Sequence, residues 1–203
     1  MILCQRNYNV TCKSGLKYHK GYEFVKWDFN RFDINKSDWV REAFENKKYA
    51  FAADYIRMYA LYTEGGIYLD MDVEVLKPFD NLLDMDYFVC YENNADNTPE
   101  VAAFGAQKGC VWIGDILSYY EGRYFLKKDG ALDCYPLPKI TKTVLQKRGY
   151  KFKPMSKITE MGGNLREKEL LILPFDYFSP KSYSTGKLYI TNNTYSIHQF
   201  SGS

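Results

Sequence analysis

The sequence predicts a single α/β domain with a mixed central sheet, and three observations support that fold class. Segments with the period of a strand alternate with segments with the period of a helix, which is typical of α/β proteins. The chain has 203 residues, enough for one domain with a sizeable core. It contains no repeat, low-complexity segment or linker, so residues 1–203 are expected to form one domain.

The N-terminal part is expected to begin without a recognisable strand, because residues 1–18 are irregular and polar. The first regular element is a strand at 22–27, where the side chains alternate between two faces. Ser37 then caps the N-terminus of a helix. The side chains that define this helix are Trp39, Val40, Ala43 and Phe44.

The segment 51–79 combines a helix, a glycine stop, a short buried strand and two aspartates. The apolar face of the helix recurs at helical spacing and contains Phe51, Tyr55, Met58, Tyr59 and Tyr62. Gly65 and Gly66 end the helix, because glycine readily adopts the left-handed conformation of a C-terminal cap. The strand that follows runs into Asp70 and Asp72, and ligands bind at this end of strands in open α/β sheets.

The spacing of Asp70 and Asp72 predicts a metal site. In an extended chain, residues i and i+2 point to the same side, so both carboxylates can face one cation while Met71 points to the core. A hard divalent ion that also binds phosphate oxygens removes the repulsion between the carboxylates. The alternative is a solvated loop after a strand, since exposed pairs of aspartates are common in turns.

The second half of the chain continues the alternation of strands and helices. The expected elements are a strand at 86–91, a strand that turns into a helix at 101–120, a helix at 137–148 and a strand at 170–173. A C-terminal β-hairpin is expected around the turn at Asn192 and Asn193. Its strands contain Leu188, Ile190, Tyr195 and Ile197.

Composition argues against several classes of function. The 27 Lys and Arg residues against 25 Asp and Glu residues leave a net charge of +2, so we expect no nucleic-acid partner. The five cysteines contain no C-x-x-C pair, which argues against structural zinc and a disulfide framework. No apolar run approaches membrane-spanning length, so we expect a cytoplasmic protein without a transmembrane segment, although peripheral membrane association stays open.

The residues around the aspartates resemble a known signature. Asp54-Tyr-Ile-Arg57, followed by YTEGGIYLDMD at 62–72, is similar to the DXD-containing sugar transferases of glycosyltransferase family 32. That family includes fungal α-1,6-mannosyltransferases and many bacterial capsule-type enzymes, and the glucosyltransferase domains of large clostridial toxins carry a similar block. The stretches 22–27, 41–51 and 177–203 agree with it. The resemblance implies a GT-A (Rossmann-like) domain, whose usual first strand is expected here to be missing or divergent.

The resemblance also implies roles for individual residues. Asp54, Arg57 and Asp70 would bind the donor sugar, and Asp70, Asp72 and His198 would bind the metal. Nucleotide and phosphate contacts would come from Tyr68, Ser201, Gly202 and Ser203. The alternatives are a surface ion pair for Asp54 and Arg57, a packing role in the core for Tyr68 and a structural role for His198. For residues 201–203 the alternative is a frayed terminus.

The implied activity is a glycosyltransferase that uses Mn²⁺ or Mg²⁺ and transfers a sugar from a nucleotide-sugar donor to a glycan or lipid-linked glycan. Asp70 and Asp72 would be its catalytic residues, and the reaction would retain configuration and serve capsular or other surface polysaccharide synthesis. An aspartyl phosphohydrolase is a weaker alternative, because Glu74 stands where those enzymes have Thr or Val. A second alternative is a catalytically degraded GT-A protein that binds a sugar or a partner.

Overall fold

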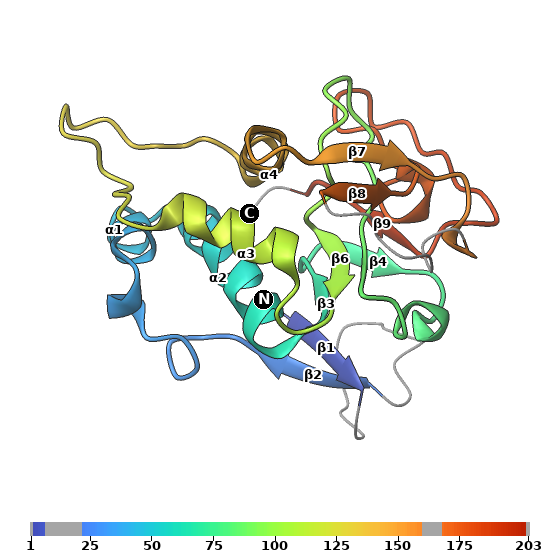
Figure 1. Cartoon of the computed structure of the whole chain (residues 1–203), viewed down its shortest axis with the longest axis horizontal. Helices are drawn as coiled ribbons and strands as arrows, with labels where there is room; N and C mark the ends of the chain where they lie inside the picture. The colour runs from blue at the N-terminus through green and yellow to red at the C-terminus, as the bar shows by residue number, and fades with distance from the viewer. Residues whose placement is uncertain (1, 7–21, 160–167, 202–203) are drawn as a thin grey trace.

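The computed structural model describes residues 2–6, 22–159 and 168–201, and they form an α/β fold built around a five-stranded sheet (Figure 1). The strand order is β2-β1-β3-β6-β5 and each neighbouring pair is antiparallel. The strands are β1 (Ile2–Arg6), β2 (Tyr22–Lys26), β3 (Gly66–Leu69), β6 (Ala103–Ala106) and β5 (Tyr87–Phe88). The predicted α/β class is therefore confirmed.

A strand forms near the N-terminus, so of the two expectations for the first strand, missing or divergent, the first is wrong. The strand β1 lies inside the sheet between β2 and β3, where Ile2 pairs with Lys26 on one side and with Leu69 on the other. Its pairing with β3 connects it to the strand that directly precedes the aspartates. The strand was not recognised in the sequence because the N-terminal residues show no alternating pattern of their own. Pairing with β2 on one side and β3 on the other determines that they form a strand.

Parallel pairing enters at the β5 edge of the sheet. The strands β7 (Lys151–Pro154) and β8 (Glu169–Ile172) pair in parallel. A parallel bridge between Cys90 and Leu173 joins the end of β8 to the chain that follows β5. The mixed character expected of the central sheet thus arises at this junction, while the five strands themselves are antiparallel.

Figure 1 shows the helices gathered beside the sheet. They are α1 (Asp38–Glu45), α2 (Tyr49–Glu64), α3 (Val111–Leu117) and α4 (Leu137–Lys147). Short 3₁₀ turns occur at Ile34–Lys36, Asp80–Leu82, Ser118–Tyr120 and Phe175–Tyr177. As predicted, Ser37 caps α1 by accepting a hydrogen bond from the N–H of Val40, and α2 ends at Gly65, whose φ of 72° needs a residue without Cβ.

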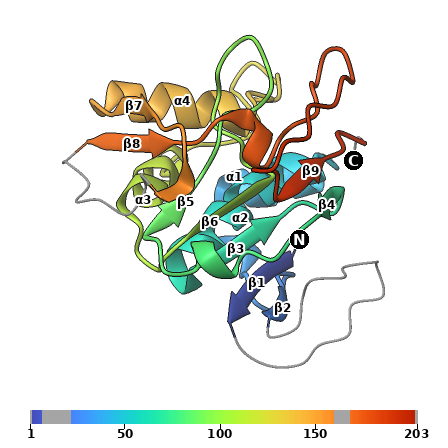
Figure 2. The ribbon, with the colours of Figure 1, turned by 90° about the vertical axis from the view of Figure 1, so that its right-hand side faces the viewer.

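The predicted C-terminal hairpin is wrong. The strand β9 (Ser196–His198) pairs antiparallel with β4 (Val73–Val75), which lies more than a hundred residues earlier (Figure 2). Leu188 and Ile190, the expected partners, are 49% and 54% exposed. Tyr195 explains the choice, because its ring stacks on Phe79 and so holds the start of β9 against the chain beyond β4.

The core is continuous and rich in aromatic side chains. The largest fully buried ones are Trp39, Tyr68, Phe32, Phe104, Phe125 and Phe178. Within the described ranges, no helix has both the length and the apolar character that crossing a membrane requires.

Candidate functional site

The two aspartates lie in a tight turn directly after β3. The N–H of Asp70 donates to the carbonyl of Ala102 at 2.8 Å and so continues the β3–β6 ladder by one step. The N–H of Val73 then donates back to the carbonyl of Asp70 at 3.1 Å, which closes the turn. Met71 is 86% exposed, so the expectation that it points to the core is wrong. An extended strand would have buried it, whereas the turn places it outside.

Asp70, Asp72 and His198 come together despite this turn. One ligand atom from each residue lies within 4.8 Å of the others, and all three side chains are partly exposed. The antiparallel register places His198 opposite Val73, and its Nε2 lies 3.6 Å from Oδ1 of Asp72. Two carboxylates and one imidazole in this arrangement are a suitable ligand set for a divalent cation.

A buried network of charges holds Asp70 from the other side. Arg57 is 6% exposed and contacts both Asp54 and Asp70. Its Nη1 lies 3.2 Å from Oδ2 of Asp70, and its Nη2 lies 3.0 Å from Oδ1 of Asp54. Nη1 also donates to the carbonyl of Val101 at 2.9 Å. Asp54 and Arg57 are therefore an interior pair linked to Asp70, which excludes the surface ion pair considered as an alternative.

Tyr68 completes this network. Its hydroxyl donates to Oδ1 of Asp70, and the guanidinium of Arg57 lies over its ring at 4.7 Å from the centroid. Both oxygens of Asp70 are thus engaged by fixed side chains. Burial raises the pKa of Asp54 to about 6, although the charge of Arg57 lowers it. The structure makes Tyr68 a buried ring that orients Asp70, and a contact of this ring with a nucleotide remains a prediction.

His198 contacts a second carboxylate that the sequence analysis missed. Nδ1 of His198 lies 3.4 Å from Oε2 of Glu100, which is 2% exposed. Burial would lower the pKa of His198, but Glu100, followed by Asp72 and Asp70, raises it overall. Burial would likewise raise the pKa of Glu100, and His198 together with the N–H of Ala102 lowers it overall. The two groups therefore stabilise each other's charge.

The chain after β9 folds over Asp72. The N–H of Gln199 donates to the carbonyl of Asp72 at 3.0 Å, and the N–H of Ser201 donates to its Oδ2 at 2.8 Å. Phe200 between them has a φ of 52°, in the left-handed region that bulky side chains rarely adopt. Ser201 was predicted to contact the diphosphate, and in this structure its N–H donates to the carboxylate of Asp72. Gly202 and Ser203 lie outside the described residues.

A family model matches the part of the chain that contains Asp70 and Asp72. Residues 6–89 match the family model described as the glycosyltransferase sugar-binding region containing DXD motif. This match spans less than half of the 203 residues of the chain. The matched segment contains Asp54, Arg57, Tyr68, Asp70 and Asp72, while the tail is brought to it by the fold.

Two individual proteins are similar to parts of this chain. Glucan organizing enzyme 1 of Cryptococcus neoformans var. grubii serotype A (strain H99) is 54% identical over 37 residues, which cover 18% of this chain and 10% of that protein. A solved structure titled PaToxG Glycosyltransferase aligns with a TM-score of 0.42 and 19% identity, covering 61% of this chain and 46% of that one. The matches thus span less than half of either relative.

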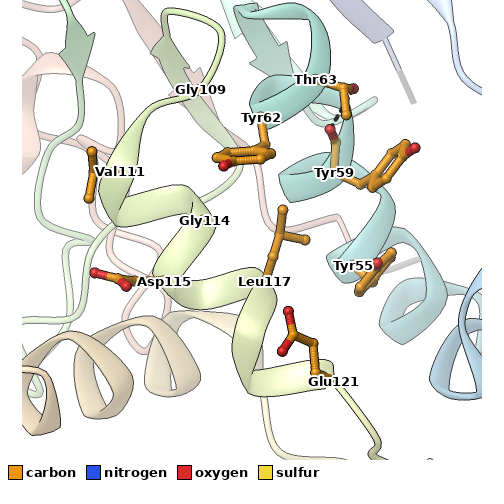
Figure 3. Close-up of a pocket in the computed structure, with 10 residues that line it drawn as sticks. All are labelled: Tyr55, Tyr59, Tyr62, Thr63, Gly109, Val111, Gly114, Asp115, Leu117 and Glu121. Carbon is orange, nitrogen blue, oxygen red and sulfur yellow. Dashed lines mark hydrogen bonds between the residues drawn. The ribbon is translucent and has the colours of Figure 1, made fainter.

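A groove of about 490 Å³ lies between α2 and α3 and is separate from the DXD site (Figure 3). Tyr62 of α2 and Leu117 of α3 line it, and Glu121 lies at one end. Tyr59, another lining residue, follows Arg57 by two positions, so the two side chains point to opposite sides of the helix. The face of α2 on which Tyr55, Tyr59 and Tyr62 recur therefore borders this groove.

The residue that sequence reasoning missed had one local signal. Glu100 stands directly before the apolar run 101–104, in which each residue is buried. A carboxylate in such a position must find a hydrogen-bonding partner or a counter-charge. That requirement predicts a partner for Glu100 but does not say which residue it is.

Proposed function

We propose that this chain is a metal-dependent glycosyltransferase that transfers a sugar from a nucleoside-diphosphate donor to a glycan or lipid-linked glycan. The observation that supports this best is the cluster of Asp70, Asp72 and His198 at the end of β3. The buried pair of Asp54 and Arg57 lies directly beside this cluster. The matched region contains Asp54, Arg57, Asp70 and Asp72. The name of the fungal relative, which mentions glucan, supports a glycan acceptor.

Asp72 and His198 would be the direct ligands of the cation, with Asp70 beside them. Because one ligand is an imidazole nitrogen, the set suits Mn²⁺ better than Mg²⁺, which prefers oxygen ligands and water. When bound, the cation supplies positive charge that stabilises the leaving diphosphate. Arg57 and Tyr68 keep Asp70 in one orientation and so limit the reorganisation that binding requires.

Asp54 and Arg57 would bind hydroxyl groups of the donor sugar. Their side chains are 15% and 8% exposed, so each retains a small accessible surface beside Asp70. The Nε of Arg57 is buried and has no hydrogen-bond partner among the described residues. Ser201, whose N–H donates to Asp72, would contact the diphosphate, and we propose the same role for Gly202 and Ser203.

Retention of configuration, a role in capsular or other surface polysaccharide synthesis, and a cytoplasmic location are further parts of this proposal that rest on the family resemblance. The intact acids argue against the alternative of a degraded, non-catalytic GT-A protein, because Asp70 and Asp72 meet His198 in one cluster and Asp54 pairs with Arg57 beside it.

A screen of nucleotide sugars tests the proposed activity. With Mn²⁺ present, at least one UDP- or GDP-sugar should be hydrolysed slowly to sugar and nucleoside diphosphate, because water replaces an absent acceptor. Mass spectrometry of the reaction mixture measures both products. The signal should disappear with EDTA and return with added Mn²⁺. A chain that binds Mn²⁺ but hydrolyses none of a complete panel of donors would contradict the proposal.

The charge of His198 predicts opposite effects of pH on stability and on metal binding. The pKa of His198 is raised in the metal-free fold. The charged imidazole should therefore contribute fully to stability below pH 6.5, the ordinary pKa of histidine, and this contribution should be lost as pH rises through the raised pKa. Metal binding needs the neutral imidazole, so Mn²⁺ affinity should rise with pH over the same range.

His198→Gln provides the comparison for this prediction. The difference in unfolding free energy between wild type and variant, measured by urea denaturation without metal, should shrink from pH 6 to pH 9. The dependence of Mn²⁺ affinity on pH should become flatter in the variant. A stability difference that grows with pH would show that the charged form of His198 is not the stabilising one.

A further inference from the structure

Glu100 is a buried carboxylate that contacts a backbone N–H and the ring of His198. Its side chain is 3% exposed, and its Oε1 accepts a hydrogen bond from the N–H of Ala102 at 2.7 Å. Its Oε2 lies 3.4 Å from Nδ1 of His198. Because burying a carboxylate without hydrogen-bonding partners costs several kcal/mol, the contact with the imidazole helps to keep Glu100 ionised.

The contact determines which nitrogen of His198 carries the proton. In a neutral imidazole, one nitrogen donates a hydrogen bond and the other accepts one. An ionised carboxylate can only accept a hydrogen bond. Glu100 is within hydrogen-bonding distance of Nδ1, whereas Asp72 lies 3.6 Å from Nε2 with no hydrogen bond, so Nδ1 carries the hydrogen that faces Glu100. Nε2 then holds the free lone pair, and it is the nitrogen that lies 3.6 Å from Asp72.

We propose that Glu100 is a positioning residue for the metal site: it fixes the tautomer and the ring orientation of His198 so that Nε2 is presented to a divalent cation at Asp70 and Asp72. The inference rests on the proposed function, because it assumes that this cluster binds a cation. Carboxylates that orient a metal-binding histidine in this way typically change metal affinity by about 10- to 100-fold when they are removed.

Glu92 offers a matched control for the charge of Glu100. It is a second largely buried carboxylate close enough to Glu100 and His198 for their charges to affect its pKa, which burial raises. Its Oε2 accepts hydrogen bonds from Thr98 and Asn94 at 2.8 and 2.6 Å. If negative charge near the cation acts in general, Glu100→Gln and Glu92→Gln should both weaken Mn²⁺ binding. If the effect acts through His198, only Glu100→Gln should weaken it.

The experiment is a Mn²⁺ titration of the full chain, in which electron paramagnetic resonance measures free Mn²⁺. Glu100→Gln should weaken Mn²⁺ binding about 10-fold or more, and Glu92→Gln should change it by less than about threefold, within the scatter of single-site measurements. In a His198→Ala background, Glu100→Gln should cause no further loss, because the residue through which it acts is absent.

The outcomes separate this inference from the proposed function. Wild type that binds no Mn²⁺ would contradict the proposed metal site itself. Wild type that binds Mn²⁺ with unchanged affinity in Glu100→Gln would overturn only the role of Glu100. An equal loss in the His198→Ala background would also overturn it, since Glu100 would then act by its charge.

A measurement on the unmodified protein covers the case in which Glu100→Gln does not fold. The chain has two histidines, so ¹H–¹⁵N spectra of protein labelled with [¹⁵N]histidine contain two ring systems, and His198→Gln identifies the ring of His198. At a pH where the ring is neutral and without metal, the proton should reside on Nδ1. A proton on Nε2 would overturn the proposal.

Discussion

Asp72→Asn should weaken Mn²⁺-dependent binding of a nucleotide sugar by about 100-fold or more, the upper end of the loss seen when residues around a metal are changed. The amide has no charge and is a poor ligand for a hard divalent cation, while its shape is almost unchanged. Because Asp72 follows β3 in a turn and its side chain is 28% exposed, the substitution should leave the fold intact.

Calorimetric titration of UDP- and GDP-sugars with and without Mn²⁺ measures this effect. Asp84→Asn is the matched control, because Asp84 is an exposed aspartate in the same part of the chain and should give wild-type affinity. The amide of Asn can still accept from the N–H of Ser201, so the contact of the tail is preserved. Equal affinity in wild type and Asp72→Asn would remove Asp72 from the metal site.

Arg57→Ala should destabilise the protein by about 3–5 kcal/mol, because it leaves two carboxylates of an interior network without their counter-charge. Asp54 and Asp70 both contact this guanidinium, and the carbonyl of Val101 would also lose its hydrogen bond. If Asp54 and Arg57 bind the donor sugar, the variant should lose affinity for the nucleotide sugar far more than for the free nucleoside diphosphate.

Two further variants make this prediction specific. Arg41→Ala removes a pair with the same i,i+3 spacing, to Asp38, but on the surface, and it should barely change the melting temperature. Arg57→Lys keeps the charge and cannot reproduce the contacts of the planar guanidinium, so it should restore stability only in part. Equal losses for nucleotide sugar and nucleoside diphosphate would make Arg57 a positioning residue for Asp70 alone.

The sequence by itself determined the features that depend on neighbouring residues. Ser37 caps α1 and Gly65 ends α2, because a cap acts within one turn of its helix. The helix, the glycines and the strand before Asp70 and Asp72 were predictable for the same reason, and so was the α/β class. Asp70 and Asp72 do lie near one point, but a turn that exposes Met71 brings their carboxylates together, and not the extended chain from which their closeness was predicted.

Only the tertiary structure decided which distant segments meet. The chain end pairs with β4 and not with residues 188–190, because burial of Tyr195 against Phe79 determines where β9 lies. That pairing brings His198 to Asp72, and the same packing places Glu100 behind the imidazole. A charged residue before an apolar run shows that it needs a partner, but the partner is chosen by the fold, since the free energy of burying a charge depends on every group around it.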